Sequence, residues 1–380
     1  MRTALRLAHL WVGLVLCLLL VVLGVTGSAL TYKEAYWRLV YPELRATGAE
    51  LDARDHAAGI RAAVEMFGPE LRSVKLPEPE VGAYHLYLAE GEAFLSVHDG
   101  RVIDRWRTGE RAMGFLFDLH AHLMAGETGE RIGGVLGLLG ALLVLSGVYL
   151  WWPARRRFRL RNLVRGGTTR PALVAAHRDL GVVAAPLLLI LLVTASGIVF
   201  YGTAGTLLNG LLPGDEPVPE ALPEEVIPAA VRTATTTGAG GGDPAPADAA
   251  LLARGSQAIP DARPVFYYPP TVDRPVHGLR LKRPCELHPN GRSYVYLDTN
   301  GGILGSVDAC AQPSGQKALY AMYPLHAGKA GSELYRFLVF LGGMILTWIS
   351  ATGACSYLAQ LLTRRRRSRE RRTVEGAATG

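Results

Sequence analysis

The sequence predicts an α-helical membrane protein: a four-span bundle made from a duplicated unit, with two small α+β domains on one side of the membrane. Three observations support this fold class. Charged residues make up only 19% of the chain, against about 25% in soluble domains. Charged residues are absent from several long runs of the sequence. Similar residues recur in the same order around these runs.

Four uncharged runs are long enough to cross a bilayer as helices, which takes roughly 20 residues. They cover residues 7–32, 132–154, 180–214 and 337–363. The first run is longer than the roughly 7–15 apolar residues of a cleaved signal peptide, and no A-x-A site follows it. We therefore expect a retained first span. Four spans exclude a soluble enzyme, a disordered chain and a protein with a single anchor.

Basic residues mark one side of the membrane. The net charge is +7, and the positive charge gathers before the first span, in the loop 155–176 with the start of the next helix, and in the tail 364–380. Positively charged loops stay on the cytoplasmic side. Both termini are then cytoplasmic, and segments 33–131 and 202–336 lie outside. We interpret the arginines as orientation signals with secondary contact to anionic lipid, and not as a nucleic-acid surface.

The first outer segment predicts a small α+β domain over 33–113, which follows a span over 1–32. Apolar residues at helical spacing predict a helix over 56–68. The dipeptide Asp99-Gly100 predicts a hairpin, because a positive φ costs least at such a pair. Strand-like runs lie at 83–89, 93–99 and 101–106.

The second outer segment begins, after a third span over 177–203, with a Pro-, Gly- and Ala-rich linker over 204–247, which cannot bury a core. A second small domain over 248–318 repeats the order of elements, with a hairpin turn at Asn300-Gly301. Cys285 and Cys310 both lie here, and a disulfide between them is favoured over two free thiols if the compartment oxidises.

The spans repeat as well. Spans 1 and 3 open with Ala-His-x-x-x-Gly at His9 and His177, and Leu-His precedes spans 2 and 4 at His120 and His326. The regions 114–154 and 319–363 each combine an interfacial segment with a span. Such internal repeats commonly place a shared site at their interface. A small residue and a glycine follow at equal distance from the second pair of histidines, at Ser146-Gly147 and Thr352-Gly353.

These four histidines are the candidate ligands. An ionisable side chain at a membrane span is costly and marks a functional site by default, although a single histidine at a helix end can also snorkel or bind a carbonyl. His9 and His177 lie at the cytoplasmic ends of parallel spans, so they can face each other. His120 and His326 can do the same on the outer side, roughly 20–30 Å away at about 1.5 Å per residue.

Two histidine pairs near opposite faces fit two haem groups, because a haem iron can take an imidazole from each side of its macrocycle. Zinc would need four ligands, commonly including Cys or carboxylate, and the uncharged runs contain no acidic residue. Bis-His ligation suits electron transfer. His122 competes with His120 as a ligand, and the equal spacing favours His120. Cations could neutralise haem propionates or simply anchor the helices: Arg6 and Arg178 at the inner pair, and Arg131, Lys329 and Arg336 at the outer pair.

The chain resembles the PepSY-associated transmembrane family, whose spans begin with a His followed by a Gly and end at a Thr/Ser-Gly pair. The resemblance rests on AHLWVG…VTG, LHAHLMAGETGERIGG…SGVYLWWP, AHRDLG…ASG and PLHAGKAG…ATG, and DGRVIDRW resembles part of a PepSY domain. It implies PepSY-like periplasmic domains and a multi-pass protein of the bacterial inner (cytoplasmic) membrane. Some members resemble ferric-siderophore reductases with two b-type haems. The chain departs from the usual motif at Ala121-His122, and it contains no flavin module.

The leading hypothesis is a haem-dependent oxidoreductase. A cytoplasmic flavin reductase or a membrane quinol would supply electrons at His9 and His177, and the haem at His120 and His326 would reduce a periplasmic acceptor. By resemblance the acceptor is a ferric siderophore, which releases Fe(II). The alternative is a non-enzymatic periplasmic PepSY binding or regulatory protein. A metal permease ranks last. The remaining outer histidines are expected at the surface: His56, His85, His98, His277 and His288.

Overall fold

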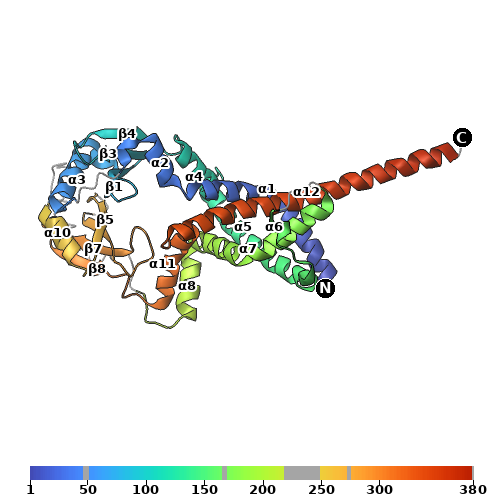
Figure 1. Ribbon diagram of the computed structural model, residues 1–380. Helices are drawn as coiled ribbons and strands as arrows, with labels where there is room; N and C mark the ends of the chain where they lie inside the picture. The colour runs from blue at the N-terminus through green and yellow to red at the C-terminus, as the bar shows by residue number, and fades with distance from the viewer. Residues whose placement is uncertain (46–50, 165–168, 218–248, 272–274, 379–380) are drawn as a thin grey trace.

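The computed structural model of the protein describes residues 1–45, 51–164, 169–217, 249–271 and 275–378. In this part of the chain four helices are long and apolar enough to cross a membrane, which confirms the predicted spans. Both termini lie at the end of the bundle away from the sheet, and the last helix extends well beyond the others (Figure 1). The four helices are α1 (Arg2–Leu30), α5 (Gly126–Trp151), α7 (Arg170–Val199) and α12 (Glu333–Ala378).

Glycines allow the spans to pack closely. Helix α1 runs along α12, and α5 runs along α7, which also contacts α12. A Cβ built on Gly24 of α1 would lie 2.6 Å from the carbonyl oxygen of Gly343, and one on Gly137 would lie 2.8 Å from that of Leu192. Such backbone proximity is typical of helix contacts in membranes, where small residues supply the packing surface.

Short helices precede and follow the spans. Helix α4 (Ala112–His122) leads into α5 through a left-handed kink at Leu123 and Met124, where φ is 49° and 59°. Helix α11 (Ser314–His326) leads into α12 through a connection in which Gly328 and Gly331 have φ of 72° and 127°. The helical boundaries differ from the predictions in two places. Helix α7 begins before residue 177, and α8 (Tyr201–Leu211) occupies the start of the segment expected to be a linker.

The predicted linker was wrong over 204–211 because its apolar Leu residues continue a helix that packs against α11. Residues 218–248 of that prediction lie outside the described residues. Smaller helices among the described residues are α2 (Lys33–Val40), α6 (Arg161–Val164), and the 3-10 turns η1 (Pro42–Leu44), η2 (Gly68–Glu70) and η3 (Trp152–Arg157).

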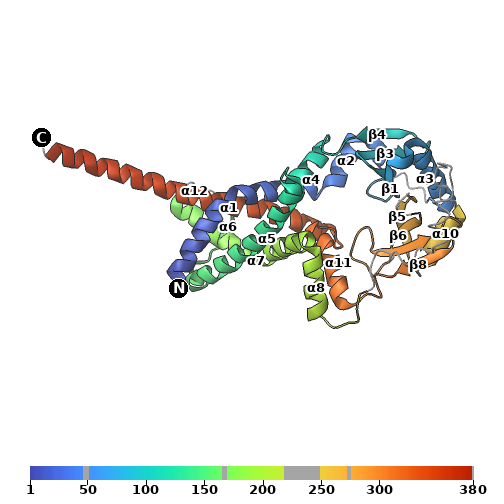
Figure 2. The ribbon, with the colours of Figure 1, turned by 180° about the vertical axis from the view of Figure 1, so that it is seen from behind.

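A single antiparallel sheet of eight strands, in the order β4-β3-β2-β1-β5-β6-β7-β8, forms the domain outside the bundle (Figure 2). The two predicted α+β units contribute four strands each and join where Val74 pairs with Tyr267 and Lys75 with Phe266. They therefore share one sheet. The strands are β1 (Leu71–Lys75), β2 (Ala83–Leu88), β3 (Gly91–Ser96), β4 (Val102–Trp106), β5 (Arg263–Tyr268), β6 (His277–Lys282), β7 (Ser293–Leu297) and β8 (Ile303–Val307).

Helices α3 (Ala53–Phe67) and α10 (Ala249–Gln257) cover one face of the sheet and bury a common apolar core with it. Asp52 begins α3 by accepting hydrogen bonds from the backbone amides of residues 54 and 55, as an N-cap residue does. Both predicted hairpin turns are confirmed, with φ of 66° at Gly100 and 78° at Gly301. Residues of the strands that alternate with this core lie on the opposite face, where Lys75 and Arg280 lie over the ring of Phe266.

Three outer histidines contradict the expectation of a surface position. His85, His277 and His288 are only 4%, 1% and 5% exposed. Each ring has a polar neighbour from a different part of the sheet, which lowers the cost of its burial. Cys285 and Cys310 form a disulfide, which ties the β6–β7 connection to the segment before α11.

Candidate functional site: two histidine pairs

The structure places the four candidate histidines in two pairs. His9 of α1 faces His177 of α7 at the end of the bundle that holds the termini, with ring centroids 6.3 Å apart. His120 of α4 faces His326 of α11 at the end that holds the sheet, with ring centroids 6.0 Å apart. We call these the termini-side pair and the sheet-side pair.

The spacing within each pair fits a metal held between two imidazoles. A ligating imidazole nitrogen lies about 2 Å from its metal, and the ring centre lies roughly 1 Å farther back. Two imidazoles on opposite sides of one metal therefore have their centres about 6 Å apart. Both measured separations agree with this value.

Two of the histidines are oriented by hydroxyl groups. The Nδ1 atom of His9 lies 2.9 Å from the Ser146 hydroxyl, and that of His120 lies 3.0 Å from the Thr26 hydroxyl. Both hydroxyls already donate their hydrogen to a main-chain carbonyl of their own helix, at 2.9 and 2.7 Å. A hydroxyl that donates its one hydrogen to the carbonyl accepts the hydrogen of Nδ1. This arrangement favours the neutral Nδ1–H tautomer for both rings.

The other two histidines are oriented by carbonyl groups. His177 Nδ1 donates to the carbonyl oxygen of Ile349 at 2.7 Å, and His326 Nδ1 donates to that of Leu191 at 3.0 Å. Within the described residues, Nε2 of none of the four histidines forms a hydrogen bond. Each ring is therefore in the tautomer of a metal-ligating histidine, with Nδ1–H held by the protein and the Nε2 lone pair available.

Glycines of the Thr/Ser-Gly pairs make room for the rings. A Cβ on Gly27 would lie 2.7 Å from Cε1 of His120, so the ring occupies the space that any larger residue would need. Each Thr/Ser-Gly pair lies at one end of its span, and the histidine that belongs to the same span lies at the other end. Gly27, Gly147 and Gly353 therefore each pack against a histidine from another helix, the last two at 3.3 Å from His9 and His177. The fourth such glycine, Gly197, differs, because its Cβ would overlap the sulfur of Met322.

The termini-side pair borders a cavity of about 380 Å³ enclosed by α1, α5, α7 and α12. A Cβ on Gly181 would meet no atom within 4 Å, and one on Gly13 would meet its nearest atom at 4.0 Å. These glycines leave open space beside the imidazoles, as a flat macrocycle requires. The guanidinium groups of Arg6, Arg170 and Arg178 also line this cavity.

Two residues from the predicted site have other partners. Arg178 forms an ion pair with the fully buried Asp179 at 2.6 Å, so its charge already compensates a carboxylate. His122 does not face His326. Its Nδ1 lies 2.9 Å from Asp118 of the same helix, and its ring contacts Phe117. The structure therefore brings His120, and not His122, to the sheet-side pair.

A comparison with protein-family models identifies the chain. The model described as the PepSY-associated TM region matches residues 6–360, which include all four paired histidines. The chain belongs to the PepSY-associated transmembrane family. No curated protein sequence matches it.

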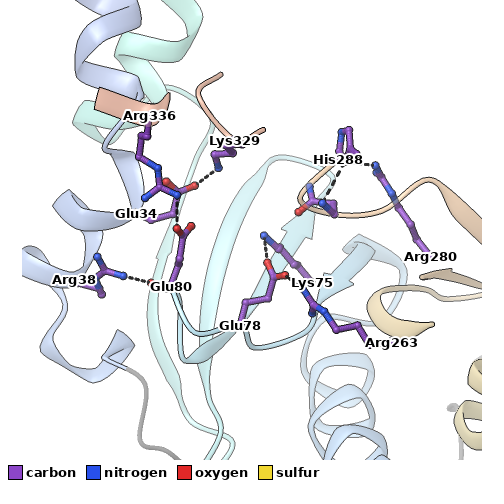
Figure 3. A network of polar contacts seen from close by, with 11 residues as sticks. Glu34, Arg38, Lys75, Glu78, Glu80, Arg263, Arg280, His288, Lys329 and Arg336 are labelled. Atoms are coloured by element: carbon purple, nitrogen blue, oxygen red, sulfur yellow. Dashed lines mark hydrogen bonds and ion pairs between the residues drawn. The ribbon is translucent and has the colours of Figure 1, made fainter. Parts of the chain in front are cut away.

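In this PepSY-associated transmembrane protein, ion pairs fix the segment that follows His326 (Figure 3). Lys329 lies 2.5 Å from Glu34 of α2, and Arg336 pairs with Glu80 of the β1–β2 connection. Burial by itself would raise the pKa of Glu34, but Lys329 and Lys33 outweigh that effect and lower the pKa to about 2. These contacts connect the first half of the chain to the start of α12.

The remaining cation expected near this pair, Arg131, pairs with Glu127 one turn earlier on α5 at 2.6 Å. All three cations on the sheet side that the sequence offered as propionate partners are therefore matched with carboxylates. The sequence pattern contained the Thr/Ser-Gly pairs, but it did not reveal that Thr26 and Ser146 hold Nδ1, because those contacts join different helices.

Proposed function

We propose that this protein transfers electrons across the membrane through two bis-His b-type haems and reduces an acceptor on the sheet side of the bilayer. The observation that carries the proposal is the pairing of four imidazoles in the metal-ligating tautomer at two levels, with ring separations of 6.3 and 6.0 Å. Haem, when bound, supplies a one-electron Fe(III)/Fe(II) couple at each level.

The chain's own residues would position the two groups. Thr26 and Ser146 lie near opposite ends of the bundle and each fixes one ring of a pair, while two main-chain carbonyls fix the others. His9 and Thr26 both belong to α1, and a helix rises about 1.5 Å per residue. The two levels are then roughly 25 Å apart along this helix, which spans most of the hydrocarbon layer of about 30 Å.

We infer the orientation from charge. The Arg-rich connection between α5 and α7 and the tail after residue 363 favour the cytoplasm, which puts the sheet in the periplasm of a bacterial inner membrane. Electrons would enter from a cytoplasmic flavin reductase or a membrane quinol. The recurrence of span, helix, four strands and span supports a duplicated unit with a PepSY-like domain in each half.

The proposed acceptor is an Fe(III)–siderophore. One electron converts the chelated Fe(III) to Fe(II), which oxygen donors hold less strongly, so the metal is released. This step consumes one electron per iron, and the chelator leaves unchanged. The chelator oxygens that leave the iron take up protons from water, so the step requires no acid or base from the protein. The Nε2 lone pairs of the four imidazoles would be used by the haem irons.

The test is the visible spectrum of the purified full-length protein and its haem content. We expect two low-spin b-type haems per chain. The double variants His9→Ala/His177→Ala and His120→Ala/His326→Ala should each retain one haem, and the control His122→Ala should retain both. A folded, colourless wild-type protein would refute the proposal and favour the non-enzymatic binding role.

A further inference from the structure

A second cavity, of about 250 Å³, lies between the sheet and the ends of α7, α8 and α11. We call it the basic cavity. Its polar side comes from β6 and the β6–β7 connection, and its apolar side comes from the end of α7 and from α8 and α11. The residues that line it are Ile198, Tyr201, Arg280, His288, Asn290, Arg292, Leu319, Met322 and Tyr323.

The basic cavity has a positive electrostatic potential. His288 is 5% exposed, and burial together with the positive charges of Arg280, Arg292, Lys282 and Lys329 lowers its pKa to about 2. The ring is therefore neutral at physiological pH, and the positive charges around it oppose its protonation.

Arg280 is held rigidly for a ligand. Its guanidinium donates to the carbonyl oxygen of Gly291 at 2.7 Å and lies over the rings of Phe266 and Tyr294 at 5.7 and 5.6 Å. Figure 3 shows it beside His288, whose ring stacks on Tyr323. In the described part of the chain no carboxylate pairs with Arg280. A cation fixed in this way binds an anion with little loss of side-chain entropy.

The basic cavity is adjacent to the sheet-side pair. Met322 and Tyr323 lie on α11 about one turn before His326, and one turn of helix is about 5.4 Å long. Ile198 lies on α7 about two turns beyond Leu191, whose carbonyl holds the His326 ring. An occupant of the cavity would therefore be next to the imidazoles that we assign to the haem on the sheet side.

We propose that the basic cavity binds the electron acceptor through an anionic group, so that the protein selects negatively charged iron(III) chelates over neutral or cationic ones. This inference rests on the proposed function. Carboxylate and catecholate donors leave negative charge on an iron(III) complex, whereas hydroxamates leave a neutral or cationic one. Arg280 provides the charge-assisted contact, and Met322, Leu319 and Ile198 accommodate the apolar part of the chelate.

Gallium(III) chelates test this inference without electron transfer, because gallium(III) has the charge and nearly the size of iron(III) but is not reduced. Isothermal titration of the full-length protein in nanodiscs of neutral lipid would compare an anionic gallium tris-catecholate with a neutral gallium trihydroxamate. We expect the anionic chelate to bind about tenfold or more tightly, because a hydrogen bond from a guanidinium group to a charged oxygen is stronger than one to a neutral oxygen.

Arg280→Gln should remove this preference, Arg280→Lys should retain part of it, and Lys317→Gln, on the exposed side of α11, should leave it unchanged. Equal binding of both chelates by the wild-type protein would overturn the inference even if no variant folded. Loss of chelate binding in nanodiscs rich in phosphatidylglycerol would also overturn it, because the cavity would then hold a lipid headgroup. Charge-selective binding by a protein without haem would instead count against the proposed function alone.

Discussion

Replacing Glu34 by Gln should destabilise the junction between the sheet domain and the bundle. Glu34 is 8% exposed and lies 2.5 Å from Lys329. Its pKa of about 2, against the usual 4.5, corresponds to roughly 3 kcal/mol in favour of the ionised form. Removing one partner of a buried pair typically costs about 3–5 kcal/mol, because the other charge stays buried without compensation. We therefore expect a loss of about 3 kcal/mol at pH 7.

The stability lost in Glu34→Gln should be large at neutral pH and should decrease in acid. A carboxylate whose pKa is lower in the folded state stabilises the protein above its unfolded pKa, and this contribution disappears as the pH falls through the folded value. For Glu34 the contribution is complete above about pH 4.5 and is lost as the pH approaches 2. Thermal unfolding of the full-length protein in detergent, followed by circular dichroism between pH 7 and pH 2, would measure it.

The matched control is Glu127→Gln. Glu127 and Arg131 form an ion pair in which both side chains are at least 70% exposed, and such pairs contribute about 0–1 kcal/mol. Adding Lys329→Met to Glu34→Gln should recover part of the stability, because it removes the uncompensated cation. An unchanged melting temperature for Glu34→Gln at pH 7, or a deficit that persists undiminished at pH 2, would refute this account of the junction.

Three further predictions concern the sites and the disulfide. Gly27→Val should eliminate the sheet-side haem, because a Cβ at residue 27 would lie 2.7 Å from the His120 ring. Gly13→Ala should retain both haems, because its Cβ would have its nearest atom at 4.0 Å, and a pyridine haemochrome assay would measure the haem content of both variants. The ring planes meet at 85° in the termini-side pair and at 36° in the other, so electron paramagnetic resonance should show two distinct low-spin signals, of which His9→Ala removes the one typical of perpendicular ligands. Cys285→Ser should cost about 3 kcal/mol because the disulfide closes a loop with a sequence separation of 25, and a reductant should lower the wild-type melting temperature equally.

Features determined by local sequence were predictable. The four spans follow from the length of the uncharged runs, and both hairpin turns follow from a glycine that adopts a positive φ. The sequence also predicted the four histidines that the structure arranges in pairs. Each half of the chain has a histidine at two equivalent positions, and this recurrence indicated which helices correspond. In each case the information lies within a few residues or in a repeat.

Features determined by distant contacts were not predictable. The pairing of β1 with β5 joins residues far apart in the sequence, and both strands carry charges that obscure an alternating pattern: Lys75 pairs with Glu78, which in turn binds Arg263. The burial of His85 and His277 has the same origin. Their partners, Glu92 and Tyr267, lie on neighbouring strands, so only the register of the sheet shows that these rings can be buried with a hydrogen bond.

The Thr/Ser-Gly motif leads to a further asymmetry that the repeat alone would not suggest. The motif hydroxyls of Thr26, Ser146 and Thr352 all donate to a carbonyl of their own helix. Those of Thr26 and Ser146, in the first half of the chain, also contact a histidine Nδ1, whereas in the second half His177 donates to the carbonyl of Ile349 instead. Each pair thus combines one imidazole held by a hydroxyl with one held by a carbonyl. Because a stronger acceptor at Nδ1–H makes the ring a more basic ligand, the two histidines that would hold each proposed haem would be chemically unequal. The helices related by the repeat therefore carry equivalent histidines whose Nδ1 atoms have different hydrogen-bond acceptors.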